Sequence, residues 1–307
     1  MRRFCWGLLL AAVLSPCTAL AGDFEQGLAT LWEVLWHQSG TPTRVVRWEK
    51  EMRVRIHGVD AAAHRERTLQ ALRAVTDEAG VRLVDVSAQP DAEQVSNVSI
   101  EITSNDQLED NQPCVTYLDF RTETQIDSAV VQMRAHDARR CAYHEAMHVM
   151  GVRGHPAGQT VLSYFPGKID GLLPLDRVML RAWYSPRMTG GMTPFEALPV
   201  LADELVAGAP DREEATQARD RFFAAILQQM HAYAAGQGDI PAVVKRSGKS
   251  TAEGIRFGRG EMSYFLGIAY MEGATAPRDA TQAVHWLQRA ATMGNRGAQA
   301  KLGAFRQ

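Results

Sequence analysis

The segment from Asp137 to Gly151 reads Asp-Ala-Arg-Arg-Cys-Ala-Tyr-His-Glu-Ala-Met-His-Val-Met-Gly and predicts a helix, because aspartate caps helix starts and glycine ends helices. His144 and His148 are four residues apart, so both imidazoles lie on one helical face and converge on one point. Neutral imidazole is a good zinc ligand, and Glu145 lies beside the first histidine, where it can accept a proton from water. The pattern therefore predicts a zinc site, with a metal-free amphipathic helix as the alternative.

A third zinc ligand is expected just beyond this helix. Gly151 lets the chain turn back in a left-handed conformation, which favours His155 as that ligand. Asp170 and Asp176 are the alternatives. The segment resembles the metzincin peptidases, which place a third histidine six residues after the second. Gly154 stands at that position here, so the turn to His155 is one residue longer.

A wider resemblance runs from about Arg44 to Leu205. It is carried by Cys141–Gly151, Thr160–Tyr164, Leu173–Arg177, Leu180–Met188 and Gly191-Met192. These stretches are similar to a bacterial domain family of unknown function whose members are described as secreted zinc-dependent peptidases. The resemblance implies a zincin-like α+β fold with a mixed sheet and an HExxH active-site helix.

Metzincins also have a methionine-containing turn beneath the metal. Val161 to Tyr164 resembles that turn with Leu162 in place of methionine, and Met188 and Met192 are later candidates. A tyrosine after such a turn often stabilises the oxyanion of the reaction. Tyr164 is the first candidate for this catalytic role and Tyr184 the second, with an aromatic packing role as the alternative for each.

Hydrophobic periodicity predicts strands and helices in a layered α/β arrangement. The expected strands are 45–59, 81–86, 98–103, 115–120 and 129–133. The expected helices are 23–36, 60–79 with Asp60 as cap, 175–184, 195–206 and 211–235, followed by a linker at 237–254 and a helical tail. The domain prediction is a zincin-like domain at 22–206 and a helical region at 207–307.

The N-terminus predicts export. Met1-Arg2-Arg3, the apolar run 6–14 and Ala19-Leu20-Ala21 form a signal-peptide pattern with cleavage before Gly22. The protein is expected to be periplasmic or secreted, without a stable membrane anchor after cleavage. Only Cys114 and Cys141 would remain, and an oxidising compartment favours a disulfide between them over two separate thiols.

The chain has 307 residues and a formal net charge of −2, so no basic surface indicates nucleic acid binding. Its tail, from Ser263 to Gly294, resembles a Sel-one-like repeat, a relative of the tetratricopeptide repeat, at about 260–294. Such repeats stack and bind proteins, but fewer than about three copies are seldom stable alone. A protein partner for this tail and a packing role without a partner are both open.

Two functions remain. The first is an exported zinc metallopeptidase that hydrolyses peptides or proteins, with His144, His148 and His155 holding Zn²⁺ and Glu145 as general base. The second is a non-catalytic interaction protein with a degenerate or structural zinc site and a binding surface on the helical tail.

Overall fold

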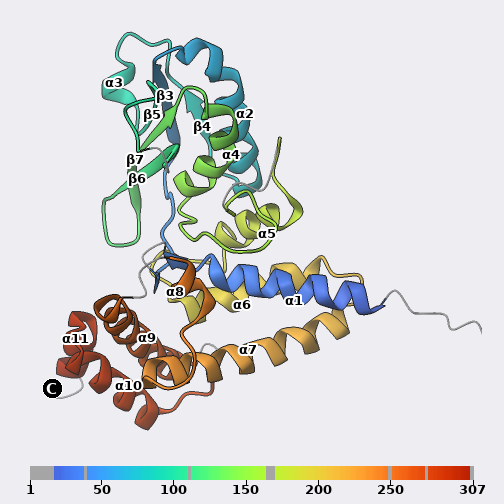
Figure 1. The fold of residues 1–307 in the computed structure, drawn as a ribbon, viewed down its shortest axis with the longest axis vertical. Coiled ribbons are helices and arrows are strands. Elements are labelled where there is room, and N and C mark those ends of the chain that lie inside the picture. Colours follow the sequence, from blue (N-terminus) through green and yellow to red (C-terminus); the bar gives the residue numbers. More distant parts are fainter. Residues whose placement is uncertain are drawn as a thin grey trace, which may run out of the picture.

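The computed structural model describes residues 17–37, 40–109, 112–163, 170–247, 251–273 and 276–304. A β-sheet with its covering helices lies at one end of the molecule, and most of the other helices gather at the opposite end (Figure 1). This confirms a mixed α+β architecture with a helical C-terminal region. None of the helices in these ranges has the length and apolar character needed to cross a bilayer.

The main sheet has five strands in the order β4-β3-β5-β7-β6. Strands β3, β4, β5 and β7 run parallel, and β6 pairs antiparallel with β7 at the edge of the sheet. Their bounds are β3 (Met52–Gly58), β4 (Leu83–Asp85), β5 (Val98–Thr103), β6 (Cys114–Phe120) and β7 (Ile126–Arg134). Two short strands, β1 (Trp36–His37) and β2 (Thr41–Pro42), form a separate hairpin that the periodicity did not predict.

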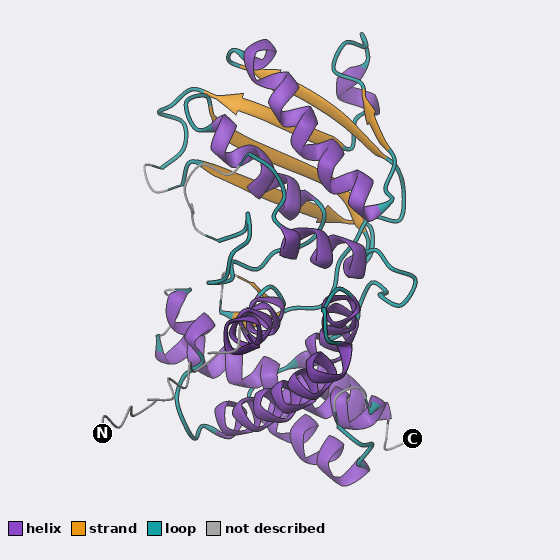
Figure 2. Cartoon of the chain, turned by 90° about the vertical axis from the view of Figure 1, so that its right-hand side faces the viewer, coloured by secondary structure: helices purple, strands orange, loops and turns teal. Residues whose placement is uncertain are grey.

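Two helices cover one face of this sheet, α2 (Ala61–Ala79) and α4 (Ala138–Val149) (Figures 1 and 2). In β3, buried residues alternate with half-buried ones, which is the pattern of a sheet with one covered face. Leu69, Leu72 and Val75 of α2 are buried as expected. A short helix, α3 (Ala92–Val95), precedes β5, and α5 (Pro174–Trp183) packs against α2.

The helical end brings together segments that are far apart in the sequence. Helix α1 (Cys17–Glu33) packs against α6 (Pro194–Ala207) and α7 (Arg212–Ala235). The predicted cleavage point before Gly22 lies within α1. The remaining helices are α8 (Ala242–Arg246), α9 (Ala252–Glu272), α10 (Ala280–Thr292) and α11 (Arg296–Ala304).

Several helices and strands extend one residue beyond their expected ends. The helix expected at 23–36 ends at Glu33, β4 is shorter than the strand expected at 81–86, and β7 begins three residues earlier than expected. Two longer segments also differ from the sequence prediction. Residues 45–51 were expected to belong to a strand, but only β3 joins the main sheet. Val45 and Trp48 are almost fully buried, and Val45 exchanges backbone hydrogen bonds with Gly191 and Met192 in a loop. The expected linker at 237–254 contains α8 and the start of α9.

Two expected helix caps also differ. Asp60 precedes α2 but makes no side-chain capping bond, since it adopts a left-handed conformation with φ 49°. Asp137 precedes α4, and its carboxylate instead accepts from Arg134 and Arg140. Gly80 ends α2 in the left-handed conformation, as predicted.

Candidate metal centre

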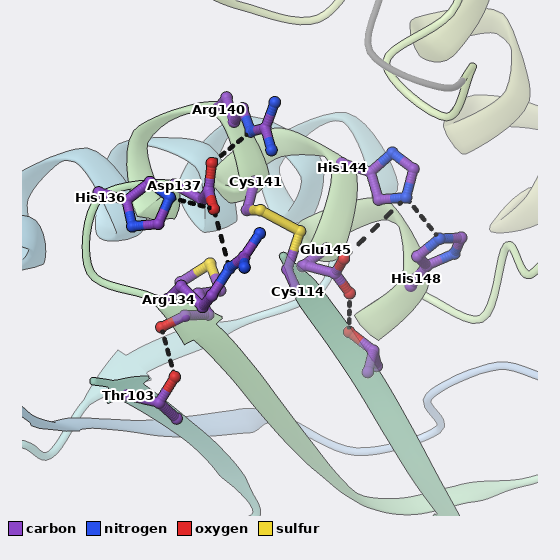
Figure 3. The surroundings of a disulfide bond; sticks show 12 residues. Thr103, Cys114, Arg134, His136, Asp137, Arg140, Cys141, His144, Glu145 and His148 are labelled. Atoms are coloured by element: carbon purple, nitrogen blue, oxygen red, sulfur yellow. Dashed lines mark hydrogen bonds and ion pairs between the residues drawn. A yellow bond between two sulfur atoms is a disulfide. The ribbon is translucent and has the colours of Figure 1, made fainter. Parts of the chain in front are cut away.

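Helix α4 carries four of the predicted site residues: Cys141, His144, Glu145 and His148. It is buried along almost its whole length, because it packs against α2 on one side and against β6 and β7 on the other. His144 and His148 lie next to each other on the helix, with the carboxylate of Glu145 nearby (Figure 3). Their exposed fractions are 7%, 9% and 3% respectively, so the site is shielded from solvent on the helix side.

The three predicted histidine ligands converge. The Nε2 atom of His148 lies 3.1 Å from Nε2 of His144 and 3.1 Å from Nε2 of His155, and the third pair is 3.2 Å apart. Among the histidine, cysteine, aspartate and glutamate side chains of the described residues, these three histidines form the group whose donor atoms lie close enough together to hold a metal ion. Two nitrogen donors on a tetrahedral zinc ion with bonds of about 2.0–2.1 Å are about 3.3–3.4 Å apart, which is close to the observed spacing.

Hydrogen bonds fix which ring nitrogen faces the centre. His144 Nδ1 donates to the carbonyl oxygen of Val161 at 2.9 Å, and His148 Nδ1 donates to the carbonyl oxygen of Val152 at 2.7 Å. A carbonyl can only accept, so each Nδ1 carries the proton and each Nε2 presents a lone pair. Lone pairs 3.1 Å apart repel unless a cation lies between them, so the donor set fits a divalent metal.

The histidines are held in the neutral form that binds metals. Burial lowers the pKa of His144, and it lowers the pKa of His155 to about 3. The pKa of His148 lies well below its ordinary value because of burial, to which the neighbouring histidines add. Proton competition for these nitrogens is therefore weak at neutral pH.

The turn after α4 delivers His155 to this centre. Gly151 has φ +91°, and a Cβ on it would lie 2.3 Å from the carbonyl oxygen of Val46. A Cβ on Gly154 would lie 2.5 Å from Val34, so this position also needs a close backbone approach. Glycine at both positions lets the backbone pass close to Val46 and Val34, so that the turn brings the side chain of His155 to the other two histidines.

The two aspartates considered as alternative ligands lie elsewhere. Asp170 pairs with Arg67 and Arg139. Asp176 accepts hydrogen bonds from the backbone N–H groups of Val161 and Leu173, which anchors the turn that holds His144.

Glu145 is positioned beside the histidines. Its Oε1 lies 4.0 Å from His144 Nε2, and its Oε2 accepts a 2.6 Å hydrogen bond from the hydroxyl of Thr116 on β6. Burial raises the pKa of Glu145 to about 7, against the hydrogen bond from Thr116, which lowers it. A carboxyl group with a pKa near neutrality can both accept and return a proton.

A disulfide joins the edge strand to this helix. Cys114 at the start of β6 is bonded to Cys141 of α4, as predicted (Figure 3). Thr116 lies two residues further along β6, so its side chain points to the same face of the sheet as Cys114. The alternation in β6 could have indicated Thr116 as the partner of Glu145 once the disulfide was assumed.

The histidines open into a cleft of about 600 Å³. The residues that line it come from the histidine cluster, from β6, from the β1–β2 hairpin and from loops. They are His37, Glu109, Gln112–Leu118, Phe120, His144, Glu145, His148, Arg153 and His155. The sequence analysis missed Thr116, His37 and Arg153, because single polar residues outside a motif carry no signal of their own.

The tyrosine candidates have different outcomes. Tyr164 lies outside the described residues. Tyr184 is not an oxyanion donor, since its hydroxyl donates to the carbonyl of Met150 at 2.9 Å and accepts from the backbone N–H of Trp48 at 3.3 Å. Of the candidates for the turn beneath the metal, Leu162 directly follows Val161, whose carbonyl accepts the hydrogen bond from His144. Met188 contacts Arg47 instead, through its backbone carbonyl.

In the helical tail, α9 and α10 form a closely packed pair. A Cβ on Gly267 of α9 would lie 2.7 Å from the side chain of Leu287 of α10, so only glycine permits this approach. Asp279 caps α10 with its side chain, and Gly273 ends α9 in the left-handed conformation.

Comparison with known proteins gives one match. No curated protein and no solved structure matches the chain. The model of the Sel1 repeat matches residues 261–295, which cover the second half of α9 and the whole of α10.

Proposed function

We propose that the protein is an exported, zinc-dependent peptidase. The observation that carries this proposal is the meeting of three Nε2 atoms at 3.1–3.2 Å, with Glu145 beside them at the bottom of a cleft. Two of the three rings are locked in the tautomer that a metal requires. The zincin-like character of the fold is part of this proposal.

His144, His148 and His155 would hold the zinc ion. Bound there, zinc would supply Lewis-acid activation of water and of the scissile carbonyl. Glu145 accepts the proton of the attacking water at Oε1, because Oε2 is engaged by Thr116, and then delivers it to the leaving amine.

The cleft favours an extended peptide as substrate. Strand β6 forms one wall of the cleft and is the edge strand of the sheet. An edge strand presents backbone groups that can pair with an added strand, which holds a peptide straight and exposes each of its carbonyls in turn. Thr116 is in the middle of this wall, so a paired peptide passes over Glu145.

Export is supported by two features of the chain. The N-terminal sequence has the pattern of a signal peptide, and the disulfide between Cys114 and Cys141 belongs in an oxidising compartment. A periplasmic or secreted location follows from the proposal.

Metal analysis of the purified protein is the first test. We expect one zinc ion per chain, its loss in His148→Ala, and its retention in Glu145→Gln. Hydrolysis of an unfolded protein substrate should be lost in both variants. His136→Ala is the matched control, since His136 is exposed and lies two residues before the start of α4. Folded wild-type protein without zinc, or full hydrolysis by Glu145→Gln, would contradict the proposal.

The second candidate function is a non-catalytic interaction protein. The Sel1 repeat favours it, since this module suggests protein–protein interaction. Purified protein that binds zinc, hydrolyses no peptide and retains a specific protein partner through α9–α10 would favour this candidate. A repeat that recruits the substrate would instead combine protein binding with the peptidase function.

A further inference from the structure

The cleft contains an arginine that the proposed reaction does not use. Arg153 lies in the turn between α4 and His155, and its side chain lines the cleft together with the three histidines. The chain is held just before and just after Arg153. The carbonyl of Val152 accepts a hydrogen bond from His148, and His155 is part of the histidine cluster. Two residues of extended chain span at most about 7 Å, so Arg153 lies close to the metal centre.

The charge of Arg153 is not balanced by an acidic side chain. Within the described part of the chain, no carboxylate lies within ion-pair distance of its guanidinium, although Glu109 lines the same cleft. The guanidinium lies over the ring of Phe120, 6.0 Å from its centroid, which orients the group without neutralising it. Its positive charge is strong enough to contribute to the lowered pKa of His37, after burial.

The carboxylates of the neighbouring cavity do not form an ion pair with Arg153 in the described structure. Arg153 and Phe120 also line a neighbouring cavity of about 320 Å³, together with Arg44, Glu123 and Glu261. Glu261 accepts a 2.6 Å hydrogen bond from Asn295, and Arg44 is the cation that acts on its pKa. Glu123 makes no ion pair with Arg153 in the described structure. A partly buried guanidinium without a counter-ion is costly, and an incoming anion offsets that cost.

We propose that Arg153 forms a carboxylate-binding subsite, so that the protein favours peptides with a carboxylate within one or two residues of the bond it cleaves. This inference rests on the proposed peptidase function. The planar guanidinium matches a carboxylate through two parallel hydrogen bonds, and Phe120 leaves its edge free for them. The carboxylate belongs either to an acidic side chain or to the C-terminus of the peptide.

The first test is a cleavage profile. The zinc-loaded full chain is incubated with synthetic peptides of randomised sequence, and the products are identified by mass spectrometry. We expect acidic residues to be enriched at one position near the cleaved bond, the enrichment to disappear in Arg153→Gln, and a preference for Lys or Arg in Arg153→Glu. Peptides with an amidated C-terminus distinguish the two sources. Enrichment that persists after amidation identifies a side chain, and cleavage near the C-terminus that is lost on amidation identifies the terminal carboxylate.

The second test measures binding without turnover. A labelled peptide with one central glutamate and a free C-terminus is titrated into the Glu145→Gln variant, and the glutamine and amidated forms are compared with it. We expect loss of the relevant carboxylate to weaken binding roughly ten- to hundredfold, as for a hydrogen bond to a charged group. The difference should vanish when Arg153→Gln is added and persist with Arg82→Gln, an exposed arginine on the far side of the sheet.

The outcomes separate the two proposals. Cleavage with no acidic or terminal preference, or a preference unchanged in Arg153→Glu, would overturn the subsite and leave the peptidase intact. Absence of zinc and of cleavage would overturn the peptidase, while the binding test would still decide the subsite. Equal or unmeasurable binding of all three peptides would count against the subsite.

Discussion

At the scale of single residues, backbone carbonyls determine which nitrogens of His144 and His148 face the proposed metal site. The carbonyls of Val161 and Val152 each accept from the Nδ1 of a histidine, so the Nε2 atoms of His144 and His148 are left to meet at the centre. One of these carbonyls belongs to a turn held by Asp176 and the other to the turn after α4. The ligands are therefore oriented before any ion binds, which reduces the ordering that binding requires.

Thr116 fixes the carboxylate of Glu145 in the same way. Thr116→Val should lower kcat roughly tenfold, because a hydrogen bond to a charged group contributes about 1.5 kcal/mol or more. KM and zinc content should remain at their wild-type values, since the hydroxyl of Thr116 donates to Glu145 and not to a histidine. Steady-state kinetics and metal analysis check this. Thr116→Ser keeps the hydroxyl and is the control, and equal kcat values for the two variants would remove Thr116 from the mechanism.

Gly151 is the residue on which the turn toward His155 depends. Gly151→Ala should destabilise the protein by roughly 1–3 kcal/mol from backbone strain at φ +91°, with the contact to Val46 adding to this. Gly171→Ala is the matched control, because a Cβ there meets no atom within 4 Å and its φ is unstrained. Urea unfolding measures both variants. If the two substitutions had the same small effect, the turn would not need its left-handed residue.

At the scale of elements, α4 is held between a helix and a strand. It packs against α2 on one side, and the disulfide from Cys141 ties its other side to β6. The same strand supplies Thr116 and the wall of the cleft. A shift of β6 relative to α4 would therefore change the position of Glu145, the proposed general base, and the width of the cleft together.

The disulfide sets that relation. Cys114→Ala/Cys141→Ala should lower the free energy of unfolding by roughly 3–4 kcal/mol, since the bond closes a loop with a sequence separation of 27 residues. Denaturant unfolding of the wild type in the presence of dithiothreitol should show the same loss. The double variant itself should not respond to the reductant. A stability equal to that of the wild type would mean that packing alone holds α4 on the sheet.

At the scale of the whole molecule, the helical end contacts the loop that carries His155 of the histidine cluster. The carboxylate of Glu33, the last residue of α1, accepts from the backbone N–H of Ala157 at 2.7 Å and pairs with Arg246 of α8 at 2.6 Å. Ala157 lies two residues after His155. A second contact joins the Sel1 repeat to the chain before β3: Arg44 donates to the hydroxyl of Tyr264 and to the carbonyl of Gly191, both at 2.7 Å.

Glu33 should therefore affect the third ligand from a distance. Glu33→Ala should weaken zinc binding about tenfold, the lower end of what outer-shell substitutions cost, because the loop that carries His155 loses its anchor. Competition with a chromophoric chelator measures the affinity. Glu25→Ala, an exposed glutamate of the same helix, should bind zinc as the wild type does. An unchanged affinity in Glu33→Ala would show that the glycines of the turn suffice.

The sequence by itself determined the features that are local along the chain. The spacing of His144 and His148 placed both rings on one helical face, Gly80 ended α2, and the strand at 98–103 was found with its observed bounds. Each of these follows from a few neighbouring residues, because helical and strand periodicity act over one or two turns or alternations. The pairing of Cys114 with Cys141 was also predicted, since only two cysteines remained after the signal peptide.

Tertiary structure decided what depends on distant segments. The sequence favoured His155 over Asp170 and Asp176, but the close approach of Val34 and Val46 to Gly154 and Gly151, which brings His155 to the other two histidines, is visible only in the tertiary structure. Thr116, His37 and Arg153 reach the cleft from a strand, a hairpin and a turn that the sheet and α1 bring together. The chain before β3 does not form a strand of the sheet, because its backbone partners lie in the loop around Gly191 and beside Gln125, which no local pattern encodes.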